Sequence, residues 1–151
     1  MKIAIASDHK GYHLKTTLIT YLTKKGYEVL DIGTNSVIAT DYPKYAFLLC
    51  EKVVNQDVNY GIVICGTGIG VSIACNKVKG IRCAKVDNIK EAELTRGDND
   101  ANVLALNGNM FAFKAKDIVD VFLKTPFSNK ERHIKRLKMI EDYEKGNYNE
   151  C

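Results

Sequence analysis

The sequence predicts an α/β domain in which five short strands form a mostly parallel sheet with helices on both faces. Two observations support this class. Short β-rich runs alternate with helical patterns along the chain, and the run at 60–65 (YGIVIC) is nearly all apolar, as expected for a strand at the centre of a parallel sheet. Parallel neighbours need crossover connections, which the helices between the strands would supply.

In the first half of the chain, three strand patterns alternate with two helical patterns. The strands are predicted at 2–7 (KIAIAS), 27–32 (YEVLDI) and 60–65. The helix between the first two strands is predicted over 13–25, with an apolar face formed by Leu14, Leu18, Ile19 and Leu22. The next helix begins at about Pro43, because proline is tolerated in the first turn of a helix.

The second half continues the alternation and ends in a charged helix. The predicted elements are a helix at 68–77, a strand at 81–86, a helix at 88–96, a strand at 102–106 and a helix at 110–124. After Pro126, residues 129–145 form a strongly charged helical pattern whose narrow apolar stripe consists of Ile134, Leu137 and Ile140 or Met139. A helix this polar packs along one face only, so we expect the terminal segment 129–151 to lie on a second subunit.

The composition indicates one globular domain spanning 1–151, with 46% hydrophobic and 26% charged residues. No apolar run approaches the roughly 20 residues that a membrane span needs, and the N-terminus turns polar too early for a secretory signal. We therefore expect a cytoplasmic protein without a membrane partner. The five cysteines form no CxxC pair, which argues against a disulfide framework or a zinc site.

Positive charge is concentrated in one segment, NKERHIKRLK at 129–138, while the net charge of the chain is only +4. This distribution favours a compact anion such as phosphate over nucleic acid as the partner. Ligands of parallel α/β sheets bind at the carboxyl ends of the strands. We expect three polar or glycine-rich loops at that edge: SDHKG after the first strand, CGTGIG after the third and TRGDNDAN before the fifth.

The stretch CGTGIG at 65–70 combines a thiol with three glycines at the end of a buried strand. Its glycines allow a ligand to approach main-chain N–H groups at the start of the next helix. The positive end of that helix would favour the thiolate of Cys65, which could act as a base or a nucleophile, and the Thr67 hydroxyl could stabilise a developing oxyanion. The stretch matches neither GxGxxG nor a P-loop, so a nucleotide cofactor is not expected. A purely structural cysteine is the alternative.

Five stretches resemble a single protein family. They are KIAIASDHKGYHLK at the start, TDYPKYA at 40–46, GIVICGTGIGVSIACNKVKGIR around the glycine loop, DNDANVLAL at 98–106 and ERHIKR near the end. Together they are similar to the ribose-5-phosphate isomerase B and galactose-6-phosphate isomerase family over nearly the whole chain. The resemblance implies a Rossmann-like three-layer domain with a five-stranded parallel sheet. It also implies a phosphorylated sugar as substrate, no metal and no cofactor, and active sites shared within a homodimer, a dimer of dimers or a pair of related subunits.

The resemblance also implies roles for particular residues. Cys65 matches the base that moves a proton between C1 and C2 of the open-chain sugar, through a cis-enediolate that Thr67 and the loop N–H groups would stabilise. The positions that match substrate-binding residues are Asp8, His9, Tyr42, Gly66, Gly68, Gly70 and Asn99. Among them, Asp8 would hold sugar hydroxyls, His9 the phosphate, and Asn99 would reach the substrate from the partner subunit.

Arg132 and Arg136 match phosphate-binding positions and, at a spacing of four residues, lie on one face of the terminal helix. Several of these residues also have a simpler structural interpretation. Asp8 could be a helix N-cap, Tyr42 could pack at a helix start, and the arginines could form a solvated face. His133 is interpreted as a surface or packing residue.

Two positions depart from the family pattern. Asp98 stands where ribose-5-phosphate isomerases B typically carry a ring-opening histidine, and Asn109 stands where they usually carry a basic phosphate-binding residue. Asp98 could still act as a base. Three functions follow: a ribose 5-phosphate isomerase of the pentose phosphate pathway, a galactose-6-phosphate or allose-6-phosphate type hexose-phosphate isomerase or subunit, or a catalytically weak sugar-phosphate-binding homologue.

Overall fold

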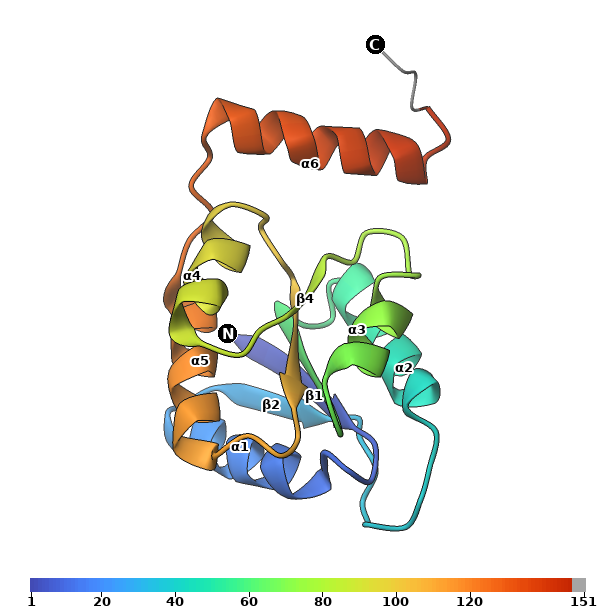
Figure 1. Ribbon diagram of the computed structural model, residues 1–151, viewed down its shortest axis with the longest axis vertical. Coiled ribbons are helices and arrows are strands. Elements are labelled where there is room, and N and C mark those ends of the chain that lie inside the picture. The colour runs from blue at the N-terminus through green and yellow to red at the C-terminus, as the bar shows by residue number, and fades with distance from the viewer. Residues whose placement is uncertain (148–151) are drawn as a thin grey trace.

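The computed structural model describes residues 1–147 and confirms the predicted α/β class (Figure 1). Five parallel strands form one sheet in the order β2-β1-β3-β5-β4. The strands are β1 (Lys2–Ser7), β2 (Glu28–Asp31), β3 (Tyr60–Cys65), β4 (Cys83–Lys85) and β5 (Val103–Asn107). The helices are α1 (Tyr12–Lys24), α2 (Tyr42–Val54), α3 (Ile69–Cys75), α4 (Ile89–Gly97), α5 (Ala112–Lys124) and α6 (Glu131–Glu144).

Helices cover both faces of the sheet and make it the middle of three layers. The face packed by α1, α4 and α5 carries large side chains such as Ile3, Ile62 and Leu104. The face packed by α2 and α3 carries small ones such as Ala4 and Ala105. This alternation follows from the two-residue period of a strand, and it lets α2 and α3 approach the sheet closely.

The strand register places three loops at the carboxyl edge of the sheet. Ser7 pairs with Ile64, and Cys65 pairs with Asn107, so β1, β3 and β5 end at nearly the same level. The loops that follow these strands therefore meet. The expectation that TRGDNDAN lies at this edge is wrong, because residues that precede a strand lie at its amino end, and Val103 pairs with Gly61 at the start of β3.

Helix α6 lies across the end of the molecule at the amino edge, apart from the three layers (Figure 1). His133 is its only buried residue. The tail that completes the predicted segment 129–151 extends past residue 147 and lies outside the described residues. Within 1–147, no helix has the length and apolar character needed to cross a bilayer.

Candidate active site

Cys65 is the last residue of β3, at the carboxyl edge of the central strand. It is buried, with 5% of its surface exposed, and it packs in the apolar cluster beneath α2 and α3. Its carbonyl oxygen accepts a hydrogen bond from Gly108 N–H at 2.8 Å. The pairing with β5 and the loop that follows β5 therefore hold the backbone of Cys65, which sets the position of its thiol.

The loop after Cys65 turns sharply at Gly68, which has a positive φ of 77°. A methyl group on Gly68 would lie 2.9 Å from the carbonyl carbon of Leu106, so both the conformation and the packing require glycine here. Thr67, just before the turn, is exposed, and its Oγ1 accepts a hydrogen bond from Ile69 N–H at 3.2 Å. The Thr67 O–H proton is then available for donation to a ligand.

Tyr42 is the first residue of α2, and its ring covers Gly70. A methyl group on Gly70 would lie 2.8 Å from Cζ of Tyr42. This close approach explains the third glycine of the loop, and it brings the phenol group to the same edge as Cys65.

Asp8 is buried in the loop after β1 and organises that loop. Its Oδ1 accepts hydrogen bonds from the N–H groups of Lys10 at 2.9 Å and Gly11 at 3.1 Å. The N-cap of α1 is Gly11, so Asp8 is not the helix N-cap. Within residues 1–147 the second oxygen, Oδ2, has no hydrogen-bond partner, which leaves it able to accept from a ligand hydroxyl.

The ring of His9 is held by the backbone of Thr40. Thr40 N–H donates to Nδ1 at 3.2 Å, and the Thr40 carbonyl oxygen lies 3.3 Å from the same atom. When Nδ1 accepts, a neutral imidazole carries its proton on Nε2 and can donate from there. Sequence reasoning missed Thr40 as a functional support, because a backbone contact leaves no signature in the side-chain pattern.

Asn109 follows β5 and braces the glycine loop instead of adding charge to it. Its Nδ2 donates to the Gly66 carbonyl oxygen at 3.1 Å. Its own N–H donates to Oδ1 of Asn107 at 2.8 Å. The candidate site around Cys65 thus contains Asp8, His9, Tyr42 and the loop 65–70, with Asn109 as a neutral support.

The remaining predicted residues lie at the other edge of the sheet. Asp98 is the C-cap of α4, with 42% of its side chain exposed, and Asn99 follows it at the surface. Both precede β5, at the level of Gly61, whereas Cys65 lies four residues further along β3, roughly 13 Å away at the rise of a strand. A single chain therefore does not bring Asp98 and Asn99 to Cys65.

Arg132 and Arg136 are exposed on α6, at the same amino edge as Asp98. Within residues 1–147, neither arginine forms an ion pair with a carboxylate. His133, between them, is buried with Nδ1 facing Asp98, so of its two interpretations, surface or packing, the structure supports packing. The sequence offers no signal for this contact, because it joins segments that are far apart in the chain.

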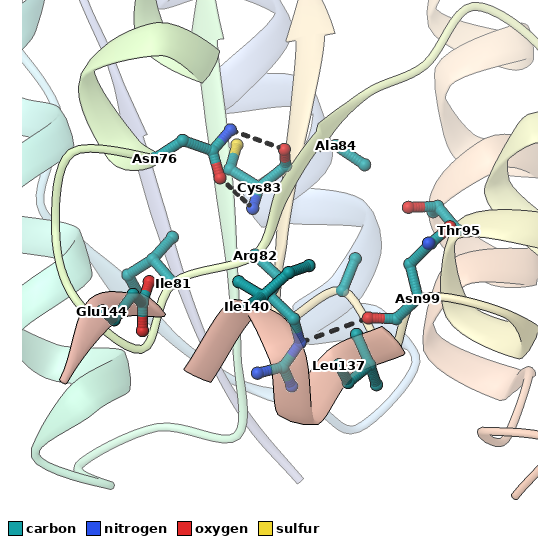
Figure 2. A pocket seen from close by; sticks show the side chains of 11 residues that line it. Asn76, Ile81, Arg82, Cys83, Ala84, Thr95, Asn99, Leu137, Ile140 and Glu144 are labelled. Carbon is teal, nitrogen blue, oxygen red and sulfur yellow. Dashed lines mark hydrogen bonds between the residues drawn. The ribbon is translucent and has the colours of Figure 1, made fainter. Parts of the chain in front are cut away.

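A pocket of about 330 Å³ opens between α6 and the amino edge (Figure 2). Leu137 and Ile140 line it from α6, and Arg82 and Asn99 line it from the body of the molecule. The side chain of Arg82 donates from Nε to the Asn99 carbonyl oxygen at 3.2 Å. The chain therefore has two separate candidate regions, one at each edge of the sheet. No cluster of three potential metal ligands occurs within 1–147.

Known proteins of one family resemble this chain in sequence. Residues 3–140 match the family model described as Ribose/Galactose Isomerase. Ribose-5-phosphate isomerase B of Escherichia coli is 42% identical over 140 residues, which cover 92% of this chain and 96% of that protein. A Bacillus subtilis protein that is provisionally described as a sugar phosphate isomerase is 44% identical over 149 residues, covering 97% of this chain and 99% of that protein.

Two solved structures show the same fold. Ribose-5-phosphate isomerase B of Clostridium thermocellum superposes with a TM-score of 0.94 at 46% identity, covering 97% of this chain and 99% of that one. The Mycoplasma genitalium enzyme of the same name, solved with bound ribulose 5-phosphate, superposes with a TM-score of 0.90 at 44% identity. That alignment covers 95% of this chain and 96% of the other.

Proposed function

This chain belongs to the Ribose/Galactose Isomerase family and is an isomerase, and on that premise we propose that it interconverts ribose 5-phosphate and ribulose 5-phosphate. The observation that carries the proposal is the glycine loop after Cys65, which the register of β1 and β3 sets beside Asp8 and His9. That edge combines a thiol, a free carboxylate oxygen and an imidazole donor. Isomerisation of a phosphorylated aldose needs a base, an acceptor for sugar hydroxyls and a donor to the phosphate, and these three groups can fill those roles.

The proposed chemistry centres on Cys65. Its thiolate removes the proton from C2 of the open-chain aldose, and a hydroxyl proton shifts from O2 to O1 as the cis-enediolate forms and collapses. The thiol then returns the proton to C1, which completes the ketose with no net gain or loss of protons. The Thr67 hydroxyl and the loop N–H groups stabilise the negative charge on the enediolate oxygen.

Binding of the substrate uses the two neighbouring side chains of the β1 loop. Asp8 accepts a hydrogen bond from a sugar hydroxyl through Oδ2, and His9 donates from Nε2 to a phosphate oxygen. The Tyr42 ring lies over Gly70 and borders the substrate on that side. Gly66, Gly68 and Gly70 leave room for the substrate beside the loop backbone and the Tyr42 ring. This matches the substrate-binding positions that the resemblance implied.

A second copy of the chain supplies the rest of the site in this proposal. Asp98, Asn99, Arg132 and Arg136 lie at the edge opposite Cys65, so they serve the Cys65 of a partner in a symmetric dimer. Exposed apolar side chains support such an interface: Ile69 and Ile73 project from α3 next to the glycine loop, and Ile134 and Ile140 from α6. Arg132 and Arg136 then clamp the phosphate, and Asp98 takes the anomeric hydroxyl proton when the sugar ring opens.

A second candidate function rests on the two departures from the family pattern. Asp98 has no proton to donate when it is ionised, and Asn109 contributes no positive charge. The absence of the ring-opening histidine favours a hexose phosphate, such as galactose 6-phosphate or allose 6-phosphate, because the family includes hexose-phosphate isomerase subunits that also lack it, whereas Asn109 alters the phosphate contact for either sugar.

Steady-state kinetics of the purified chain alone distinguish these functions. We expect the highest kcat/KM for ribose 5-phosphate among ribose 5-phosphate, galactose 6-phosphate and allose 6-phosphate. Cys65→Ala should abolish turnover, whereas Cys50→Ala should retain it, because a neighbouring thiol, Cys75, and burial raise the pKa of the Cys50 thiol and keep it protonated. Preference for a hexose phosphate would establish the second candidate, and full activity of Cys65→Ala would overturn the mechanism.

A further inference from the structure

His133 is the one buried residue of a helix whose other residues are exposed or half-buried. Only 3% of its surface is accessible, although its neighbours on both sides along α6 are exposed. Its ring sits between α6, the end of α4 and the segment that precedes α6, where Ser128 N–H donates to the Gly97 carbonyl oxygen at 2.9 Å. A side chain that only filled this space would need no polar atoms.

Both ring nitrogens of His133 have polar partners. Nε2 lies 3.0 Å from Nε of Arg132. Nδ1 lies 3.0 Å from Oγ of Ser128 and 3.4 Å from Oδ1 of Asp98. Because the arginine Nε–H can only donate, Nε2 is the acceptor, and a neutral ring then carries its proton on Nδ1, facing Ser128 and Asp98.

His133 contacts one polar atom of each charged side chain, Nε of Arg132 and Oδ1 of Asp98. The remaining polar atoms of both side chains stay open. The Nη atoms of Arg132 have no hydrogen-bond partner in the described chain, and the same holds for Oδ2 of Asp98. The imidazole lies between the Arg132 guanidinium and the Asp98 carboxylate and contacts both, and the two charged groups form no ion pair with each other in the described chain. The guanidinium fork and the carboxylate oxygen thus both remain available to a ligand.

We infer that His133 is a positioning residue of the isomerase site, one that holds Arg132 for the phosphate and Asp98 for the sugar ring at a set separation. This inference rests on the proposed function, in which the two side chains act on one substrate. The Nε2 acceptor orients the guanidinium and so governs substrate affinity. The Nδ1 donor orients the carboxylate and so governs the rate of ring opening.

Two conservative substitutions separate these two contacts. Gln at position 133 reaches the place of Nε2 with an amide oxygen, whereas Asn places an amide N–H near Nδ1 and does not reach Arg132. We therefore expect His133→Asn to raise KM for the sugar phosphate about tenfold with kcat little changed. We expect His133→Gln to lower kcat about tenfold with KM little changed.

Inorganic phosphate provides an independent probe of the arginine. Used as a competitive inhibitor, phosphate should have a higher inhibition constant for the His133→Asn variant than for the wild type. Its inhibition constant for the His133→Gln variant should equal that of the wild type. In an Arg132→Ala background, His133→Asn should add no further increase in KM, because the contact it removes is already absent. The same substitution at the exposed His13 of α1 serves as the control and should leave both kinetic parameters unchanged.

Activity of the wild type tests the proposed function, and the kinetics of the variants at position 133 test the positioning role. If the wild type turns over no sugar phosphate, the proposed function is wrong. If the wild type is active but Asn and Gln at position 133 change kcat and KM alike, or change neither, His133 has no positioning role. Thermal unfolding of each variant identifies a loss of activity that comes from misfolding, and His133→Phe, which fills the space without polar atoms, should show both defects together.

Discussion

At the scale of single residues, the shape of the glycine loop depends on Gly68. Its positive φ costs any other residue about 1–2 kcal/mol, and a methyl group there would also meet the backbone of Leu106. Gly26 offers a matched control, since its φ is also positive but nothing lies within 4 Å of a methyl group placed on it. Substitutions at Gly68 and Gly26 therefore separate the cost of the positive φ from the cost of the contact with Leu106.

We predict that Gly26→Ala lowers the free energy of unfolding by about 1 kcal/mol and leaves isomerase activity intact. Gly68→Ala should lower the free energy of unfolding by at least 1 kcal/mol more and should also reduce kcat, because the loop backbone must shift. Chemical denaturation and steady-state kinetics measure both effects. Equal losses of stability in the two variants would show that the contact with Leu106 does not matter.

The sequence was informative about those residues whose surroundings are local. Cys65 could be placed at a strand end because the apolar run before it and the glycines after it define that end. His133 could not be placed, because its partner Asp98 belongs to a distant segment and the pattern of α6 alone suggests exposure. The free oxygen of Asp8 was likewise hidden, since it depends on which backbone groups the other oxygen binds.

At the scale of elements, periodicity predicted every helix and strand that the structure describes, with the ends shifted by a few residues. The edge of the sheet at which TRGDNDAN lies was predicted wrongly. Polar composition marks a loop, but only the direction of the strand that follows decides at which edge the loop lies. The third helix is also shorter than predicted, at Ile69–Cys75 instead of 68–77, so its dipole is smaller than a longer helix would provide.

A polar contact ties α1 to α5. Oδ2 of Asp120 accepts from the Tyr21 hydroxyl at 2.9 Å and pairs with the Lys25 ammonium. Burial alone would raise the pKa of Asp120, but the hydrogen bonds from Lys25 and Tyr21 outweigh it and lower the pKa below its ordinary value of 3.8. A carboxyl group whose pKa is lowered by folding stabilises the fold above its unfolded-state pKa and loses that contribution as the pH falls through its folded-state pKa.

We predict that Asp120→Asn lowers the free energy of unfolding at pH 7 by about 1 kcal/mol. The difference from the wild type should shrink below about pH 4 and vanish once the native carboxyl is protonated. Denaturation curves at several pH values measure this dependence. Asp117→Asn, an exposed change on the same helix, is the control and should have little effect. A loss for Asp120→Asn that does not change with pH would mean that packing, not charge, is responsible.

At the scale of the whole molecule, the predicted site residues divide between the two edges of the sheet. The resemblance implied that Asn99 acts from a partner subunit. Asp98, Asn99 and α6 lie at the edge away from Cys65, so the proposed dimer is what would bring them to a thiol. Periodicity could not predict this division, because it reports which residues share a face of one element and not how two copies meet. We therefore propose that the Cys65 edge of one copy and the α6 edge of another form one isomerase site.

Complementation between inactive variants measures whether two copies of the chain share a site. Cys65→Ala disables one edge, and the double variant Arg132→Ala, Arg136→Ala disables the other, so each should be nearly inactive alone. When the two chains are co-expressed with different affinity tags and the mixed species is purified, each mixed dimer should contain one intact site, and activity should recover to about half that of the wild type. A mixed species no more active than either variant alone would contradict the claim.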